Sequence, residues 1–96
     1  MVIENAFVLI REGEEEAFEK AMRETGIPSL AKCPGVRTAR LARGVENPSK
    51  FFFIVEWDSI EAHDAARASE AFSAFGQAGL PFYGLGGGMD HMVFVI

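Results

Sequence analysis

The stretch FFFIVEWDSIEAHDAARASEAFSAF, residues 51–75, decides how this chain folds. It opens with an apolar run that ends at Trp57 and is typical of a buried strand. Asp58 or Ser59 follows as a helix N-cap, and an alanine-rich helix carrying His63 comes next. This strand–turn–helix joint is expected to bring an indole and an imidazole to one corner of the fold.

The remaining elements are predicted from apolar periodicity and from turn residues. In the first half we expect a strand at 2–10, a helix at 14–25 stopped by Gly26 and Pro28, one further helical turn at 29–33, and a strand at 36–43. A turn at 44–50 leads to the strand at 51–57 and a helix to about residue 68, with a continuation at 70–78 capped by Ser69. A glycine-rich loop at 79–88 and a last strand at 90–96 complete the chain. The order β-α-β-β-α-β predicts a ferredoxin-like α+β fold, with a four-stranded antiparallel sheet and both helices on one face. All 96 residues are expected to form a single domain.

The strands lack the apolar–polar alternation of a sheet that has one face in water. Residues 6–10, 51–55 and 92–96 are apolar throughout. Two helices can cover only one face, and each buried Phe side chain contributes roughly 1.5–3 kcal/mol. We therefore expect a second copy of the chain to cover the other face, in a twofold homodimer.

Composition argues against several classes of partner. The net charge is −5, whereas nucleic acids and anionic membranes attract basic surfaces. No apolar run approaches the roughly 20 residues that span a bilayer. Cys33 is the single cysteine and no signal peptide is visible, so we expect a cytoplasmic protein. One cysteine and two histidines predict no metal site.

Three residues, one at a strand end, one within a strand and one on a helix, are the first candidates for a site. His63 is either a general base, since imidazole titrates near neutral pH, or an ordinary surface or interface histidine. Trp57 either stacks on a flat ligand or anchors the core. Asn5 interrupts an apolar strand, so its amide is either satisfied locally or directed at a ligand.

Further candidates for substrate binding are aromatic or polar. His91 either hydrogen-bonds a ligand or caps the last strand, and Tyr83 either supplies a phenol or merely packs. Arg40 is either a contact for an anion or a ketone, or a solvated edge charge. Phe72 and Phe75 are candidates for apolar pocket walls.

Motifs in a fixed order span nearly the whole chain. They are the Pro34-Gly35 turn, the strand ending Val55-Glu56-Trp57, the run Ser59-x-Glu61-Ala62-His63, Ser69 with Phe72, and Asp90-His91. Together they resemble the antibiotic biosynthesis monooxygenase family. The resemblance implies a dimeric α/β barrel with a pocket between helices and sheet in each subunit. Among such proteins, some oxidise polycyclic phenols with oxygen and no cofactor, some degrade haem, and others are isomerases.

The same resemblance argues against haem. Haem-degrading relatives carry an axial His where this chain has Gly76, and a Trp where it has Ala66, although Asn5 is similar to their first-strand Asn. What the resemblance then implies is a monooxygenase that needs no cofactor and acts on a small hydroxyaromatic or quinol-type substrate.

Under this interpretation His63 is the base, Asn5 holds the oxyanion, and Trp57, Phe72 and Phe75 form the walls. Two alternatives stay open. One is a non-oxidative isomerase or lyase acting on a lactone or enol. The other is a dimer that binds an apolar metabolite without chemistry.

Overall fold

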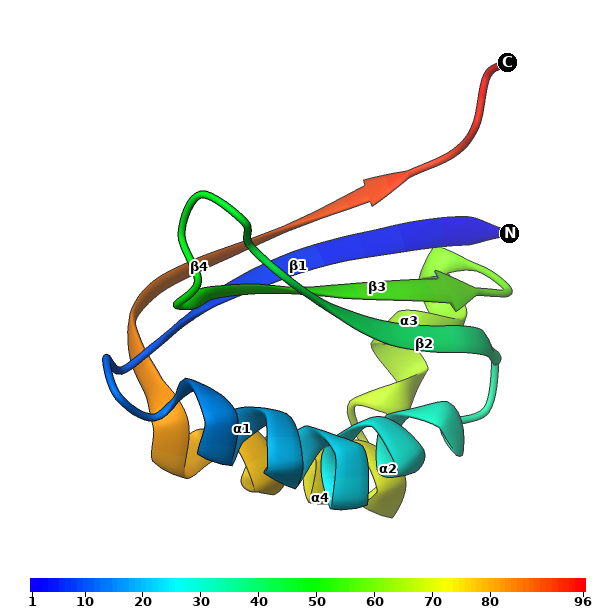
Figure 1. Cartoon of the computed structure of the whole chain (residues 1–96). Helices are drawn as coiled ribbons and strands as arrows, with labels where there is room; N and C mark the ends of the chain where they lie inside the picture. The colour runs from blue at the N-terminus through cyan, green and yellow to red at the C-terminus, as the bar shows by residue number, and fades with distance from the viewer.

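The computed structural model describes all 96 residues and shows one antiparallel sheet with the helices on one face (Figure 1). The strands are β1 (Val2–Ile10), β2 (Val36–Arg43), β3 (Lys50–Trp57) and β4 (Tyr83–Met92), arranged in the order β2-β3-β1-β4. The helical elements are α1 (Glu15–Ala21), the π-helical turn η1 (Met22–Gly26), α2 (Ile27–Ala31), α3 (Ile60–Ala66), α4 (Glu70–Gly79) and the 3-10 turn η2 (Leu80–Phe82). The predicted ferredoxin-like α+β fold is confirmed. None of the helices is long and apolar enough to cross a membrane.

The first helical segment is longer than predicted, because neither Gly26 nor Pro28 stops it. Gly26 keeps a right-handed helical backbone, and the Met22 side chain occupies the space that a Cβ at position 26 would need. The π-helical turn joins α1 to α2, and Pro28 lies in the first turn of α2, where a missing N–H is tolerated. The predicted end at residue 25 is therefore wrong.

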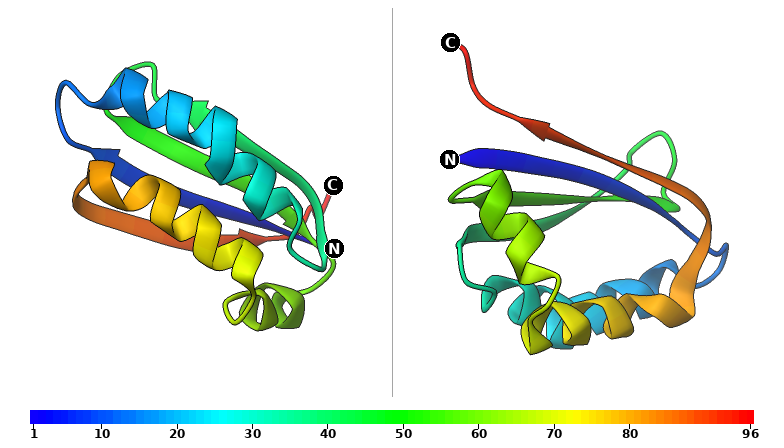
Figure 2. Two further views of the ribbon diagram at one scale, coloured as in Figure 1. Left: turned by 90° about the horizontal axis from the view of Figure 1, so that it is seen from below. Right: turned by 180° about the vertical axis from the view of Figure 1, so that it is seen from behind.

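The second helical segment follows the predicted caps. The Ser59 hydroxyl accepts the N–H of Ala62 at 3.1 Å, and the Ser69 hydroxyl accepts the N–H of Phe72 at 3.1 Å. Between these caps the chain bends, so α3 and α4 have separate axes instead of forming one continued helix (Figure 2). Because of this bend, α3 packs against the end of β3.

The glycine-rich segment is a strand, which corrects the predicted loop at 79–88. Gly88 pairs with Phe7, and a Cβ at position 88 would lie 2.7 Å from the Phe7 ring. A side chain at position 88 would therefore have to displace the neighbouring Phe7 ring. The last strand ends at Met92, opposite Ile3, because β1 offers almost no chain beyond that point. Residues 93–96 leave the sheet and project from the molecule (Figure 1).

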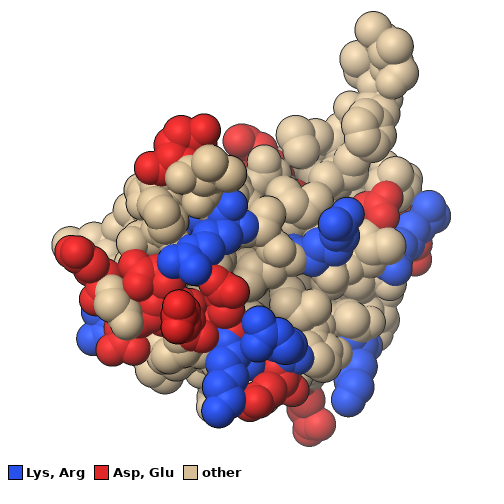
Figure 3. Space-filling view, viewed as in Figure 1, with Lys and Arg blue, Asp and Glu red and all other residues tan.

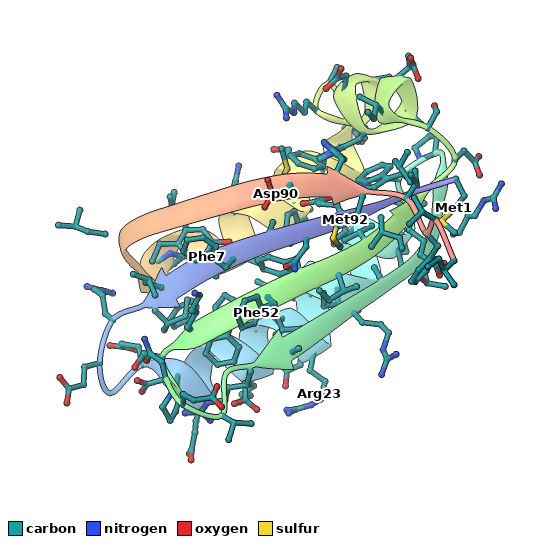
Figure 4. All side chains as sticks on the ribbon, turned by 90° about the horizontal axis from the view of Figure 1, so that it is seen from above. Met1, Phe7, Arg23, Phe52, Asp90 and Met92 are labelled. Atoms are coloured by element: carbon teal, nitrogen blue, oxygen red, sulfur yellow. The ribbon has the colours of Figure 1, made fainter.

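The two faces of the sheet have different environments. Phe51, Phe53, Val55 and Trp57 face the helices, and Phe18 of α1 packs edge-on against Phe51 with ring centroids 4.9 Å apart. The opposite face, which we call the open face, has no helix over it, and Figure 4 views it from above. Its apolar side chains are Ile3, Phe7, Leu9, Ala42, Phe52, Ile54 and Met92. The second face predicted from the sequence is thus apolar in part, and a row with the polar residues Arg40, Asn5 and Asp90 crosses it.

Candidate functional site

Strand register brings three side chains to one corner on the helix-covered face of the sheet, and helix α3 adds a fourth. Glu4 of β1 lies opposite His91 of β4, and Trp57 at the end of β3 lies opposite the start of β1 on the same face. Helix α3, started by its Ser59 cap, lays His63 over this corner. We call Glu4, Trp57, His63 and His91 the corner cluster.

The corner cluster is linked by short polar contacts and by ring stacking. His63 Nδ1 lies 2.8 Å from His91 Nε2. The His63 ring stacks on Trp57, with centroids 4.5 Å apart and planes 13° from parallel. Trp57 Nε1 donates a hydrogen bond of 2.9 Å to Glu4 Oε1, and His63 Nε2 lies 3.5 Å from the same oxygen. Indole, carboxylate and both imidazoles thus form one connected chain.

Burial separates the two histidines. Trp57 is 0% exposed, His63 2% and Glu4 8%, whereas His91 is half-buried. Burial lowers the pKa of His63, and its neighbour His91 lowers it further, while the Glu4 carboxylate acts in the opposite direction. His63 is therefore held as a neutral imidazole, and His91 is the member of the cluster that reaches the surface.

The lowered pKa of His63 predicts a loss of stability in acid. The unfolded chain binds the proton more readily than the folded chain, so the contribution is full above the unfolded value near 6.5 and is lost as the pH falls below it. We expect urea unfolding between about pH 8 and about pH 5 to show a steeper loss for the wild type than for His63→Phe, which keeps a ring against Trp57. Equal slopes would contradict this assignment.

The predicted aromatic residues divide into two groups. Phe72 lies 6.3 Å from the His63 ring between centroids, and Phe75 lies 5.6 Å from Phe72, so both continue the apolar wall beside the cluster. Tyr83 is at the far end of β4, opposite Ile10, and packs 6.1 Å from Phe18. Burial raises the pKa of the Tyr83 phenol. The structure therefore brings Phe72 and Phe75 to the corner cluster and leaves Tyr83 away from it.

Asn5 and Arg40 lie on the other side of the sheet. Both pair with Ile54, so they belong to one row across the open face. Successive strand residues point to opposite faces, and Glu4 is the one that faces the helices. The predicted pairing of Asn5 with His63 around one anion is therefore wrong within a subunit.

Sequence reasoning missed Glu4. Its signal was the adjacent polar pair Glu4-Asn5 in an apolar strand, of which only one member can face the helices. Whether Glu4 or Asn5 faces the helices depends on which alternate residues of β1 point to that face. The surrounding residues of β1 are apolar on both faces, so they do not indicate the answer.

None of the four corner-cluster residues lines either of the two hollows in the surface. The larger, about 510 Å³, is lined by Pro34, Gly35, Asp58, Ser59, Glu61, Ala62, Ala65, Ala66 and Ser69. The smaller, about 390 Å³, is lined by Glu19, Met22, Arg23, Ile27, Pro28, Ala31 and Leu41. Neither contains a histidine, so the expected pocket at His63 is closed by its own side chains. No group of three or more His, Cys, Asp or Glu side chains is placed to hold a metal ion.

Comparison with known proteins agrees with this fold. The sequence profile of the antibiotic biosynthesis monooxygenase family matches residues 1–78. The chain belongs to this family. It is 36% identical over 63 residues to the uncharacterized protein YczJ of Bacillus subtilis (strain 168), and the match covers 66% of this chain and 65% of YczJ, just under two thirds of each.

Solved structures extend the likeness over the whole chain. A Bordetella bronchiseptica protein provisionally named as an antibiotic biosynthesis monooxygenase superposes with a TM-score of 0.90, covers 99% of this chain and 97% of its own, and is 22% identical. One from Nitrosomonas europaea with the same provisional name gives 0.80 at 12% identity, with complete coverage of both chains. At such identities the likeness concerns the fold, and the chemistry has to be argued from the corner cluster.

Proposed function

We propose that this protein is a cofactor-independent monooxygenase of a small hydroxyaromatic or quinol-type substrate, with the histidine pair as its base. The observation that carries the proposal is the contact of 2.8 Å between His63 Nδ1 and His91 Nε2. These are the chain's two histidines, contributed by α3 and β4, and the fold joins them beside an aromatic wall. Family membership supports the same type of reaction.

The chemistry needs a base and a flat apolar contact more than it needs a redox centre. In a substrate whose CH2 group is activated by hydroxyaromatic rings, the base removes one proton and leaves an electron-rich carbanion. The carbanion passes one electron to O2, and the substrate radical and superoxide combine to a peroxide, which takes up the proton. Loss of water then yields a carbonyl, so that CH2 and O2 become C=O and H2O. Each oxygen atom and each electron is accounted for without a cofactor.

The residues of the corner cluster fit these steps. His91 is half-buried and is the imidazole that a substrate can reach, while His63 is enclosed. Phe72 and Phe75 extend beside the pair and would flank a planar ring system. Because the corner is closed, a substrate can enter only if side chains or α3 move. The closed corner excludes water, and this exclusion protects the carbanion.

Oxygen uptake tests the proposal. Metal-stripped protein would be assayed with anthrone-like and hydroquinone substrates beside His63→Ala and His91→Ala, with Glu46→Gln in the exposed β2–β3 turn as the matched control. We expect both histidine variants to lose about 10²–10⁴-fold in rate, as is usual for a general base, and the control to match wild type. Rates that do not depend on either histidine would refute the proposal.

The same assay separates the alternatives. Equal turnover without oxygen would indicate an isomerase or lyase. Tight binding of these aromatics with no product would indicate a carrier of an apolar metabolite.

The proposal includes a homodimer through the open face, in a cytoplasm that keeps the buried Cys33 reduced. Phe7, Leu9, Phe52 and Ile54 of that face are half-buried with no helix over them, and the tail residues Val93, Phe94, Val95 and Ile96 are exposed. Figure 3 shows the C-terminal tail clear of the body and free of charged side chains. A second copy of the chain is the partner that presents a matching apolar surface.

A further inference from the structure

We propose that Glu4 sets the order of donors and acceptors along the corner cluster, so that His91 Nδ1 is the atom that accepts the substrate proton. Glu4 is then a positioning residue, since it acts through His63 without touching the substrate. This inference rests on the proposed function and specifies which of the two imidazoles carries the base.

The indole nitrogen of Trp57 can only donate a hydrogen bond. It donates to Glu4 Oε1 at 2.9 Å, which makes that oxygen an acceptor. A carboxylate offers acceptors alone, so the nitrogen of His63 that faces it, Nε2 at 3.5 Å, is favoured as an N–H. The two groups do not form a hydrogen bond at this geometry, so the preference is electrostatic: a lone pair on Nε2 would be repelled by the negative oxygen, and an N–H is attracted to it.

A neutral imidazole carries one ring proton, and this determines the next contact. With the proton of His63 on Nε2, its Nδ1 presents a lone pair. His91 Nε2 lies 2.8 Å from that lone pair and must donate an N–H to it. His91, when neutral, is therefore left with its lone pair on Nδ1, the ring nitrogen that the pair does not use.

Burial agrees with this assignment. His63 is 2% exposed and His91 is half-buried, so the free lone pair belongs to the imidazole that lies nearer the surface. The charged groups that act on His63 are Glu4 from β1 and Asp64 and Arg67 from α3. A proton taken by His91 Nδ1 places the positive charge at the edge of the protein, and the Nε2–H bond to His63 holds the ring in position. A buried carboxylate that fixes an imidazole tautomer has the same function in serine proteases.

The test reads the tautomers directly, by long-range proton–nitrogen correlation spectra of ¹⁵N-histidine-labelled protein near neutral pH. We expect both His63 and His91 to carry the proton on Nε2 and to show an unprotonated Nδ1. Wild-type spectra with the proton of His91 on Nδ1 would overturn the inference, and this result needs no variant to fold.

Two variants examine the part played by Glu4. Glu4→Gln keeps the shape but adds a donor, so His91 should acquire a population protonated on Nδ1. The rate constant kcat for oxygen uptake should then fall about 10–100-fold, as when other carboxylates that orient an imidazole are removed, with KM little changed. Trp57→Phe leaves the carboxylate in place and should keep the wild-type tautomers. Unchanged His91 tautomers in Glu4→Gln would overturn the positioning part of the inference.

Failure of the proposed function would look different. If the spectra show the expected tautomers while no substrate consumes oxygen, the order of donors is supported and the oxygenase is refuted. If oxygen uptake needs both histidines while His91 carries its proton on Nδ1, the oxygenase is supported and the assignment of His91 Nδ1 as base is overturned.

Discussion

Replacing Trp57 by alanine is expected to lower the free energy of unfolding by about 3–5 kcal/mol, the usual cost of deleting a buried large aromatic side chain. Trp57 is 0% exposed and belongs to the hydrophobic core, so its removal leaves a cavity under α3. The substitution also removes the indole N–H that Glu4 accepts and the ring on which His63 stacks. Since native proteins are commonly stable by only about 5–15 kcal/mol, urea unfolding should show a large part of the stability lost.

Trp57→Phe separates packing from hydrogen bonding. Phenylalanine keeps a ring against His63 but leaves the buried Glu4 oxygen without its donor, which costs about 1–3 kcal/mol. The variant should therefore fall between wild type and Trp57→Ala in urea midpoint at a similar slope. A Trp57→Phe protein as stable as wild type would show that the bond to Glu4 contributes nothing.

The fold was predictable wherever local signals and tertiary environment agreed. Ser59 and Ser69 act as the caps that their positions indicate. The prediction for the glycine-rich strand was wrong, because glycine normally marks a loop. The space beside Gly88 is occupied by the ring of Phe7, about eighty residues away in sequence. A local pattern cannot contain that information.

The site was predictable to the same extent. Trp57 and His63 are joined by one short turn, so their proximity follows from the sequence. The contact between His63 and His91 depends on the pairing of β1 with β4, which the mistaken loop at 79–88 concealed. The choice between Glu4 and Asn5 depends on the phase of β1, and the apolar run at 6–10 gives no alternation from which to read it.

A charge at the centre of the open face is expected to separate the proposed dimer. Phe52 is half-buried there, opposite Phe7 and Ala42, and a twofold interface would contain it twice. Because Phe52 is already half-buried in the subunit, the two lost rings account for only part of the roughly 1.5–3 kcal/mol that full burial of each Phe gives. Two carboxylates in an apolar interface cost several kcal/mol more, which weakens the dimer by about 10²-fold or more. Light scattering over a range of concentrations should then find Phe52→Asp as a monomer where the wild type is a dimer.

The matched control is Val45→Asp, which adds the same charge in the β2–β3 turn, where Val45 is 87% exposed. It should remain dimeric. Phe52→Asp should keep its fold, because position 52 faces away from the helix-covered core and Lys50, whose ammonium lies 5.4 Å from the Phe52 ring, can pair with the new carboxylate. A monomeric wild type would refute the dimer. If Phe52→Asp stays dimeric, the interface does not lie on the open face, and the apolar side chains of that face have no partner.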